Sequence, residues 1–125
     1  MKILTGTDII EISRIKDSIE NLGDAFKNKI YTEKEIEYCE NRKNVKYQHY
    51  AGRFAAKEAI FKAVSDLLGN KFEISWKDAE VINDKNGRPK ITFIDKNLED
   101  KIESIDISIS HCKEYAVSSV VIICK

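Results

Sequence analysis

The sequence predicts an α+β domain in which a small, mostly antiparallel sheet packs on one long helix. Apolar residues recur at helical intervals over one long segment, about Lys46 to Leu68, and short β-forming segments dominate the second half of the chain. In order, the predicted elements are β-α-α-α-β-β-α-β-β, which is typical of this class. The chain has 125 residues, a single proline and no repeat or linker. We therefore expect residues 1–125 to form one domain.

The chain opens with a strand and a helix. Residues 2–10 are rich in β-formers and predict a strand that is interrupted at Gly6. The segment "ISRIKDSIENLG" then predicts a helix, because its apolar residues recur at helical intervals until Gly23 ends the pattern. Those apolar residues are Ile12, Ile15, Ile19 and Leu22.

Two more helices are predicted before the second half of the chain. Thr32 is followed three residues later by Glu35, a capping box that predicts the start of a helix in "TEKEIEYCENR". The long helix comes next, and Gly69 is placed to cap its C-terminus.

The second half of the chain predicts mainly strands. The segment "AEVINDKNGRPKITFI" indicates two short strands about a turn at Asn86-Gly87, and "DKNLEDKI" indicates a short helix. In "SIDISISH" apolar and polar residues alternate, which is typical of a half-buried strand. The alternating positions are Ile105, Ile107 and Ile109 against Asp106, Ser108 and Ser110. "EYAVSSVVIIC" predicts the final strand.

Composition excludes several classes of protein. Lys+Arg and Asp+Glu both number 21, so we expect no nucleic-acid partner and no anionic-membrane partner, either of which favours a basic excess. The first residues, "MKILTGTDII", are too short and polar for a signal peptide or a membrane span. Cys39, Cys112 and Cys124 are an odd number without C-x-x-C spacing, which indicates reduced, buried thiols in a cytoplasmic protein rather than zinc ligands or disulfides.

Four charged residues lie among the apolar residues of the long helix. Arg53 and Lys57 fall inside the apolar arc, where each could extend its head group to water. Glu58 and Lys62 fall together at the edge of the arc, at the i, i+4 spacing of an ordinary surface ion pair. Alternatively, Glu58 binds a hard cation such as Mg²⁺ while Lys62 holds a phosphate oxygen.

A metal site needs a second carboxylate, and Asp8 is the best candidate. It ends an otherwise apolar strand, where a buried carboxylate needs a partner; the alternative is that Asp8 caps the following helix. His111 sits just past a strand, beside Ser110, and could donate to a phosphate or ribose. Its alternative role is that of a structural hydrogen-bonding group. His49, in the polar start of the long helix, is interpreted as a surface residue.

Together, three segments resemble one enzyme family. "GTDIIEISRI", "AGRFAAKEAIFKA" and "ISISHCKEYA", in this order and with an N-G-x-P turn in "NGRPKI", resemble the holo-[acyl-carrier-protein] synthases. These are the short bacterial type of 4'-phosphopantetheinyl transferase. The resemblance spans nearly the whole chain. It implies a transferase of fatty acid and lipid metabolism that moves 4'-phosphopantetheine from coenzyme A to a serine of an acyl carrier protein, leaving adenosine 3',5'-bisphosphate.

The resemblance also implies roles for individual residues. Asp8 and Glu58 are the expected ligands of Mg²⁺, and Lys62 is expected at the coenzyme A pyrophosphate as the third catalytic residue. Arg53, Ser110 and His111 are expected near the coenzyme's phosphates. Either Glu58 or a metal-bound water is then the acceptor of the serine proton.

Assembly and docking are implied in the same way. Similar proteins are homotrimers of pseudo-barrel subunits with coenzyme A at the subunit interfaces. The turn that contains Gly87 and Pro89 is therefore expected at the adenosine of a coenzyme held mainly by a neighbouring subunit. Arg14, on the first helix, is expected to dock the acidic carrier protein, with help from Lys16 and from Lys27 and Lys29. The family's usual hydroxyl residue after His111 is here a cysteine.

Two other functions fit parts of the pattern. A magnesium-dependent nucleotide pyrophosphohydrolase would use the same acids and lysine, with water as the acceptor. A small α+β RNA-binding module would need no chemistry, but the neutral charge and the lack of an aromatic and basic strand disfavour it.

Overall fold

The computed structural model describes residues 1–68 and 74–125, and these contain five helices and five strands. The elements, in chain order, are β1 (Ile3–Glu11), α1 (Ile12–Leu22), α2 (Asp24–Ile30), α3 (Glu33–Glu40), α4 (Lys46–Leu68), β2 (Ala79–Asn83), β3 (Pro89–Phe93), α5 (Lys96–Glu99), β4 (Ile102–His111) and β5 (Tyr115–Cys124). Short 3₁₀ turns precede α4 and β2.

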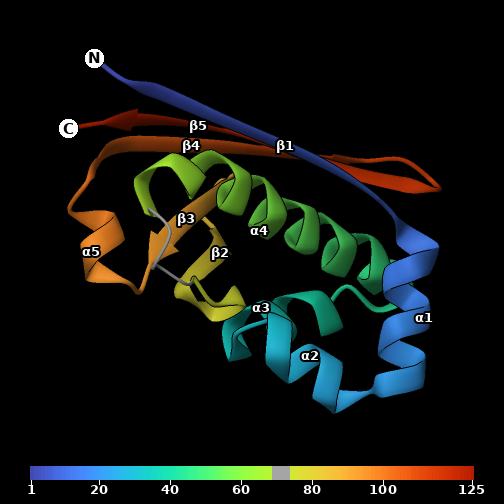
Figure 1. The fold of residues 1–125 in the computed structure, drawn as a ribbon. Coiled ribbons are helices and arrows are strands. Elements are labelled where there is room, and N and C mark those ends of the chain that lie inside the picture. The colour runs from blue at the N-terminus through green and yellow to red at the C-terminus, as the bar shows by residue number, and fades with distance from the viewer. Residues whose placement is uncertain (69–73) are drawn as a thin grey trace.

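The strands form two antiparallel sheets rather than the one sheet expected. Three long strands pair in the order β1-β5-β4, and β2 pairs with β3 in a separate hairpin. The three-stranded sheet lies over α4, while α2, α3 and the hairpin lie on the other side of that helix (Figure 1). Helix α1 runs down from the end of β1 beside the start of α4. The predicted α+β class, with antiparallel strands on one long helix, is confirmed.

The central helix α4 is buried on more sides than an amphipathic surface helix. Its small residues allow the sheet to approach closely, and Ala55, Ala56, Ala59 and Ala63 are all buried. It also contacts α1, α3 and β2. The expectation that Arg53 and Lys57 extend to water is therefore wrong: Lys57 is fully buried and Arg53 is 3% exposed.

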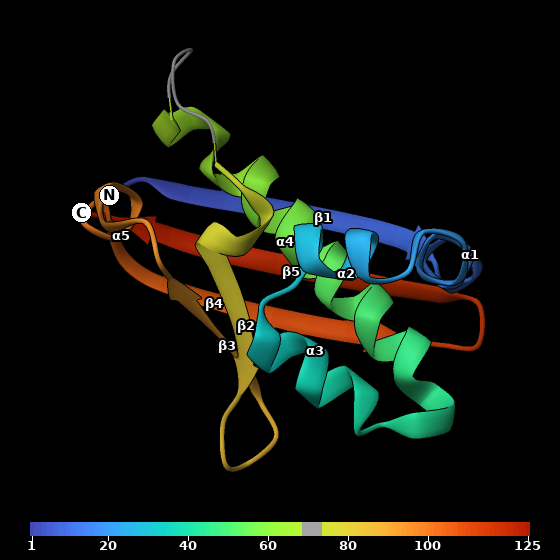
Figure 2. The ribbon, with the colours of Figure 1, turned by 90° about the horizontal axis from the view of Figure 1, so that it is seen from below.

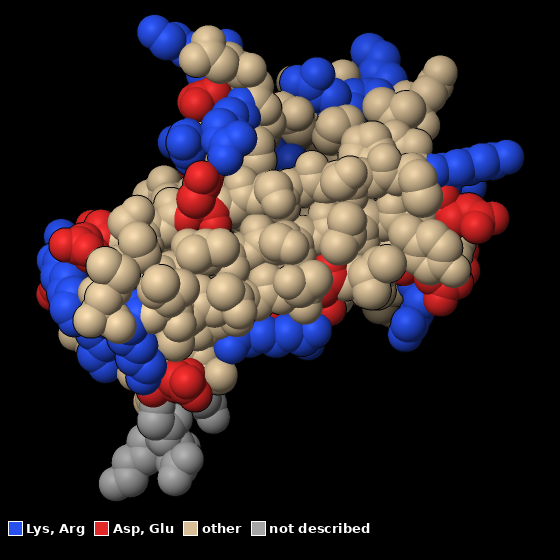
Figure 3. All heavy atoms as spheres, turned by 90° about the horizontal axis from the view of Figure 1, so that it is seen from above, with Lys and Arg blue, Asp and Glu red and all other residues tan. Residues whose placement is uncertain are grey.

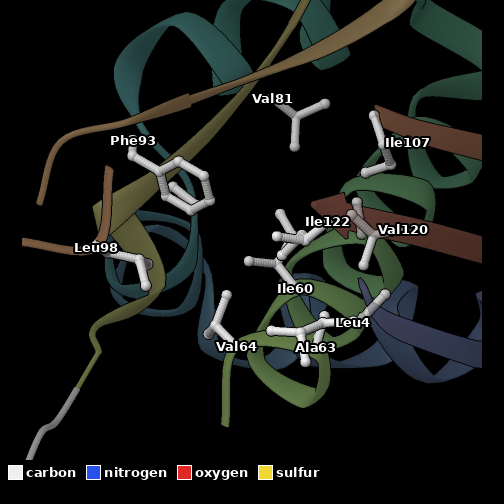
Figure 4. Packing of buried hydrophobic residues seen from close by; sticks show 13 residues of the cluster. Leu4, Ile60, Ala63, Val64, Val81, Phe93, Leu98, Ile107, Val120 and Ile122 are labelled. Carbon is white, nitrogen blue, oxygen red and sulfur yellow. The ribbon is translucent and has the colours of Figure 1, made fainter. Parts of the chain in front are cut away.

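The interior contains two apolar clusters that both include residues of α4. In the first, Ile60 and Val64 of α4 contact the sheet on one side and the β2–β3 hairpin on the other (Figure 4). The second cluster joins the start of α4 to α1, α2 and α3 around Tyr31 and Tyr50. The ring centroids of these two tyrosines are 4.9 Å apart. The helix thus connects both halves of the fold, so side chains along it occupy fixed positions relative to every other element.

Strand β1 runs through Gly6 without a break, contrary to prediction. Alternate residues of β1, among them Leu4, Gly6 and Asp8, face inward, because successive side chains of a strand point to opposite faces. A Cβ atom at Gly6 would collide with the carbonyl oxygen of Ala59 on α4. The glycine therefore permits the close contact of β1 and α4, and that contact brings Asp8 toward the helix.

Most local predictions hold. The capping box is formed: Thr32 Oγ1 accepts from Glu35 N, and Glu35 Oε1 accepts from Thr32 N. Gly87 has a φ of 83° in the predicted turn, and α5 occupies the expected short helix. The predicted cap at Gly69 lies outside the described residues. Helix α2 was missed, because seven residues with one fully buried side chain give too short a pattern.

The outer face of the three-stranded sheet is largely apolar. Space-filling atoms that are neither acidic nor basic cover its middle, and charged side chains lie mostly at its margins (Figure 3). Four large side chains of β1 and β5 are exposed on this face: Ile3, Ile9, Tyr115 and Val121. None of the helices in residues 1–68 and 74–125 has the length and hydrophobicity needed to cross a membrane.

Candidate functional site

Asp8, Glu58 and Lys62 form what we call the acid cluster, where the inner face of β1 meets α4. Lys62 Nζ lies 3.1 Å from Asp8 Oδ1 and donates a second hydrogen bond, 3.0 Å long, to the carbonyl oxygen of Thr7. The alternative role for Asp8, capping α1, is wrong, because Glu11 holds the N-cap position and makes no side-chain cap bond. The i, i+4 ion pair expected between Glu58 and Lys62 is also absent from the salt bridges of the described residues.

The two carboxylates of the acid cluster share one electrostatic environment. Burial, and next the negative charge of Asp8, raise the pKa of Glu58, whereas Lys62 lowers it. Asp8 is mostly buried, with its side chain 15% exposed. Two carboxylates that repel each other and share one lysine are a set of hard oxygen donors suited to a divalent cation. In the described residues, no group of three or more Asp, Glu, His or Cys residues is arranged to hold a metal.

Lys57, one residue before Glu58, belongs to a different arrangement, which we call the buried ion pair. Its ammonium lies 2.8 Å from Glu35 Oε1 and donates to the carbonyl oxygens of Trp76 and Ala79. Glu35 is fully buried as well, and its second oxygen accepts from Val81 N. Burial lowers the pKa of Lys57, and Glu35 opposes that effect. Because each polar group is satisfied, this pair fastens α3, α4 and β2 together.

A second group of predicted residues lines a cavity of about 190 Å³ at the β4 edge of the sheet. We call it the basic cavity. Its walls are Tyr38, His49, Arg53, Asn83, Gly87, Pro89, Ile109 and His111. Arg53 donates to Asn83 Oδ1 at 2.6 Å, and its guanidinium carbon lies 3.9 Å from the centroid of the Tyr38 ring. In the described part of the chain, Arg53 Nε is the only buried side-chain nitrogen or oxygen atom without a hydrogen-bond partner.

The structure separates Ser110 from the other predicted phosphate contacts. Side chains of β4 alternate, so Ser110 and Asp106 are exposed while Ile107 between them is buried. Ser110 lies outside the basic cavity, whereas Gly87, Pro89 and His111 line it. That Ser110 contacts the same ligand as His111 therefore stays a prediction.

The interpretation of His49 as a surface residue is wrong. It is half-buried, and its ring centroid lies 5.5 Å from that of Tyr38 and 5.7 Å from that of His111. Burial first, and then the positive charges of Arg53, His111 and Arg42, lower the pKa of His49 to about 4. Tyr38, His49 and Asn83 were all missed as site residues. A helical signal existed for His49, which precedes Arg53 by four residues.

Arg14 is exposed on α1, as expected for a docking residue. Close to it, Lys16 and Lys113 line a hollow of about 380 Å³ between the start of α1 and the β4–β5 turn. Lys27 is already engaged, since its ammonium lies 3.5 Å from a Glu40 oxygen. Of the cysteines, Cys39 is buried as predicted but Cys112 is exposed, and all three are free.

The acid cluster and the basic cavity lie at opposite edges of one antiparallel sheet. Residues 5–120 match the 4'-phosphopantetheinyl transferase superfamily, and the chain belongs to it. Within this superfamily, it belongs to the holo-[acyl-carrier-protein] synthases. One such relative, from Ruminiclostridium cellulolyticum, is 47% identical, with 98% of this chain and 92% of the relative covered. Another, from Fusobacterium nucleatum, is 44% identical over 98% of this chain and 100% of its own.

Solved structures agree with this assignment. The holo-[acyl-carrier-protein] synthase of Helicobacter pylori, in complex with coenzyme A, superposes with a TM-score of 0.83 at 29% identity and covers 96% of this chain and 100% of its own. The corresponding enzyme of Bacillus anthracis, in complex with coenzyme A (3',5'-ADP), gives a TM-score of 0.75 at 38% identity over 95% and 94% of the two chains. The family resemblance drawn from the sequence is confirmed.

Proposed function

We propose that residues 1–125 form one catalytic domain that transfers 4'-phosphopantetheine from coenzyme A to a serine of an apo acyl carrier protein. The serine oxygen attacks the phosphorus next to the pantetheine. A new P–O bond forms there, the pyrophosphate P–O bond breaks, and adenosine 3',5'-bisphosphate leaves while the serine loses its proton. The observation that carries the proposal is the acid cluster, in which Asp8, Glu58 and Lys62 come together from β1 and α4.

The donors of the acid cluster fit Mg²⁺. Asp8 and Glu58 supply hard oxygens, and Glu58 makes none of the side-chain hydrogen bonds found among the described residues. A bound magnesium ion would neutralise pyrophosphate charge and polarise the phosphoryl group. We assign Asp8 and Glu58 as the residues that would hold it.

Lys62 and Glu58 each have a further task in this proposal. Lys62 stabilises negative charge on the leaving bisphosphate, because its ammonium is held at the cluster by Asp8 and the Thr7 carbonyl while 54% of its side chain is exposed to a ligand. Either Glu58 or a water held beside it takes the serine proton.

We further propose that the active enzyme is a ring-shaped homotrimer. The acid cluster lies at the β1 edge of the sheet, and the basic cavity lies at the β4 edge beside the β2–β3 hairpin, which projects past β4 (Figure 2). Head-to-tail contacts between unlike edges close into rings. Such a ring would place the acid cluster of one subunit beside the basic cavity of the next, with Gly87 and Pro89 at the adenosine. The apolar outer face of the sheet supports subunit contact.

The carrier protein would dock at α1. Arg14 is exposed there and offers positive charge to an acidic partner. In the adjacent hollow Lys16 and Lys113 are balanced by Glu11 and Glu114, so the docking charge comes from Arg14. We place the reaction in the cytoplasm, because the three cysteines are free thiols.

Mass spectrometry of an apo carrier protein incubated with this protein, coenzyme A and Mg²⁺ tests the proposal. We expect one phosphopantetheine on a serine and an equal amount of adenosine 3',5'-bisphosphate. A parallel reaction without carrier protein tests the competing pyrophosphohydrolase. Rapid coenzyme A cleavage in that reaction, with no modified serine in the first, would replace transfer by hydrolysis.

A further inference from the structure

His49 is the one histidine for which neither the sequence pattern nor the proposed reaction provides a role. It projects from the first turns of α4 into the basic cavity, between Tyr38 of α3 and His111 of β4. Its contacts therefore come from elements that are far apart in the sequence, and the second apolar cluster, which contains Tyr50, holds its helix in place.

The basic cavity has the electrostatics of an anion site. None of the described residues that line it is acidic. The charged and titratable groups that face His49 are Arg53, Arg42, His111 and the Tyr38 hydroxyl. Arg53 is almost fully buried, with 3% of its surface exposed, and its Nε has no hydrogen-bond partner among the described residues. A buried guanidinium with an unused donor is costly unless a ligand completes its hydrogen bonds.

Coenzyme A offers this cavity one particular group, if the proposed function holds. Its pyrophosphate is the reacting centre and belongs at the acid cluster. The remaining anion is the ribose 3'-phosphate, a monoester that carries close to two negative charges near neutral pH. We propose that His49 binds this 3'-phosphate together with Arg53 and His111, and that it takes up a proton from solvent when the phosphate binds.

The proton uptake follows from the charges that surround His49. Burial, and next the positive charge of Arg53, lower the pKa of His49 to about 4, so the free protein holds a neutral imidazole near neutral pH. A phosphate dianion at the cavity reverses the sign of the local field, which favours the imidazolium. The protonated ring then donates from both nitrogens, one of them to a phosphate oxygen.

Calorimetry with adenosine 3',5'-bisphosphate, in two buffers of different ionisation enthalpy, measures the protons exchanged. We suggest about pH 7.5, because the ligand's own phosphate is nearly fully ionised there. We expect net proton uptake by the wild type. The His49→Gln variant should lose most of this uptake and bind about tenfold more weakly, the effect of one charge-assisted hydrogen bond. Adenosine 5'-monophosphate, which lacks the 3'-phosphate, should bind both proteins equally.

NMR can follow the protonation of His49 directly, because the chain contains only two histidines and their signals are easily told apart. Imidazole resonances of His49 and His111 can be assigned with His49→Gln and the matched control His111→Gln. We expect the His49 titration to move upward by about three pH units in the bisphosphate complex, because proton uptake near pH 7.5 requires a bound pKa close to that pH. The His49 signal should persist in His111→Gln.

The outcomes separate this inference from the proposed function. Wild-type binding of the bisphosphate with an unmoved His49 titration, or an equal loss of affinity for the 5'-monophosphate in His49→Gln, would overturn the role of His49 alone. No binding of either nucleotide by the wild type would instead contradict the proposed function.

Discussion

Two lysines of α4, five residues apart, each pair with a carboxylate. One pair is placed to stabilise the fold, and the other is placed to bind a ligand. Lys57 lies 2.8 Å from Glu35 with no exposed side-chain surface on either residue, and two carbonyl oxygens complete its hydrogen bonds. Lys62 lies 3.1 Å from Asp8 with 54% of its side chain exposed. Every group of the buried ion pair is satisfied. In the acid cluster, Glu58 has no side-chain hydrogen bond among the described residues. Of the two pairs, therefore, the acid cluster is the one with a group free to bind a cation.

The largest effect is expected from the acid cluster. Asp8→Asn or Glu58→Gln should lower kcat by about a thousandfold or more, because each removes a charge that acts on the reacting phosphate. The free energy of unfolding should change by less than about 1 kcal/mol: either change removes repulsion between two carboxylates, and Asp8→Asn also loses a partly exposed ion pair with Lys62. Mass spectrometry of carrier protein and thermal melting of the variants give the two values. Near-normal turnover at saturating Mg²⁺ would show that these acids are not the metal site.

The buried ion pair should respond in the opposite way. Lys57→Met leaves Glu35 buried without its cation, and this should cost about 3–5 kcal/mol of unfolding free energy. Denaturant titration monitored by tryptophan fluorescence measures it. Lys62→Met is the matched control, expected to cost less than about 1 kcal/mol because its pair is partly exposed.

A double variant tests the cause. Glu35→Gln added to Lys57→Met should restore part of the stability, since the neutral amide can still accept from Val81 N and no buried charge remains. If the double variant were less stable than Lys57→Met, lost packing rather than an unpaired charge would explain the cost.

These two regions also show how far sequence reasoning extends. The sequence predicted that Asp8, Glu58 and Lys62 lie together, from the i, i+4 spacing of Glu58 and Lys62, the place of Asp8 at the end of an apolar strand, and the family resemblance. The buried ion pair was missed. Whether Lys57 extends to water depends on α3 and β2 covering α4, and no pattern within α4 encodes that contact. The basic cavity was predicted only in part. Its walls come from α3, α4, β4 and the hairpin, and no local pattern shows that these elements meet.

Gly6→Ala should damage the acid cluster without changing a charge. The new methyl group would collide with the Ala59 carbonyl and push β1 from α4, costing about 1–3 kcal/mol. Because Asp8 follows two residues later on the same face, we also expect kcat to fall, by about tenfold if the misplacement costs about 1.4 kcal/mol in the transition state. Gly23→Ala, between α1 and α2, is the control: it strains a positive φ but should leave the β1–α4 contact intact. Equal kcat losses in both variants would point to general destabilisation.

The smallest effect is expected from a charge outside both regions. Arg14→Glu should raise the KM for carrier protein by about tenfold, because an exposed charge acts on encounter with an acidic partner, while the KM for coenzyme A and the free energy of unfolding stay unchanged. Steady-state kinetics with each substrate varied in turn, at low and at high salt, measures this. The difference between wild type and variant should shrink at high salt, since screening weakens interactions between exposed charges. Lys96→Glu, another exposed change from basic to acidic but on α5, is the matched control and should show a smaller effect. An equal rise in the KM for carrier protein and the KM for coenzyme A would show that Arg14 acts at the coenzyme site. Its effect could then no longer be separated from that of the acid cluster.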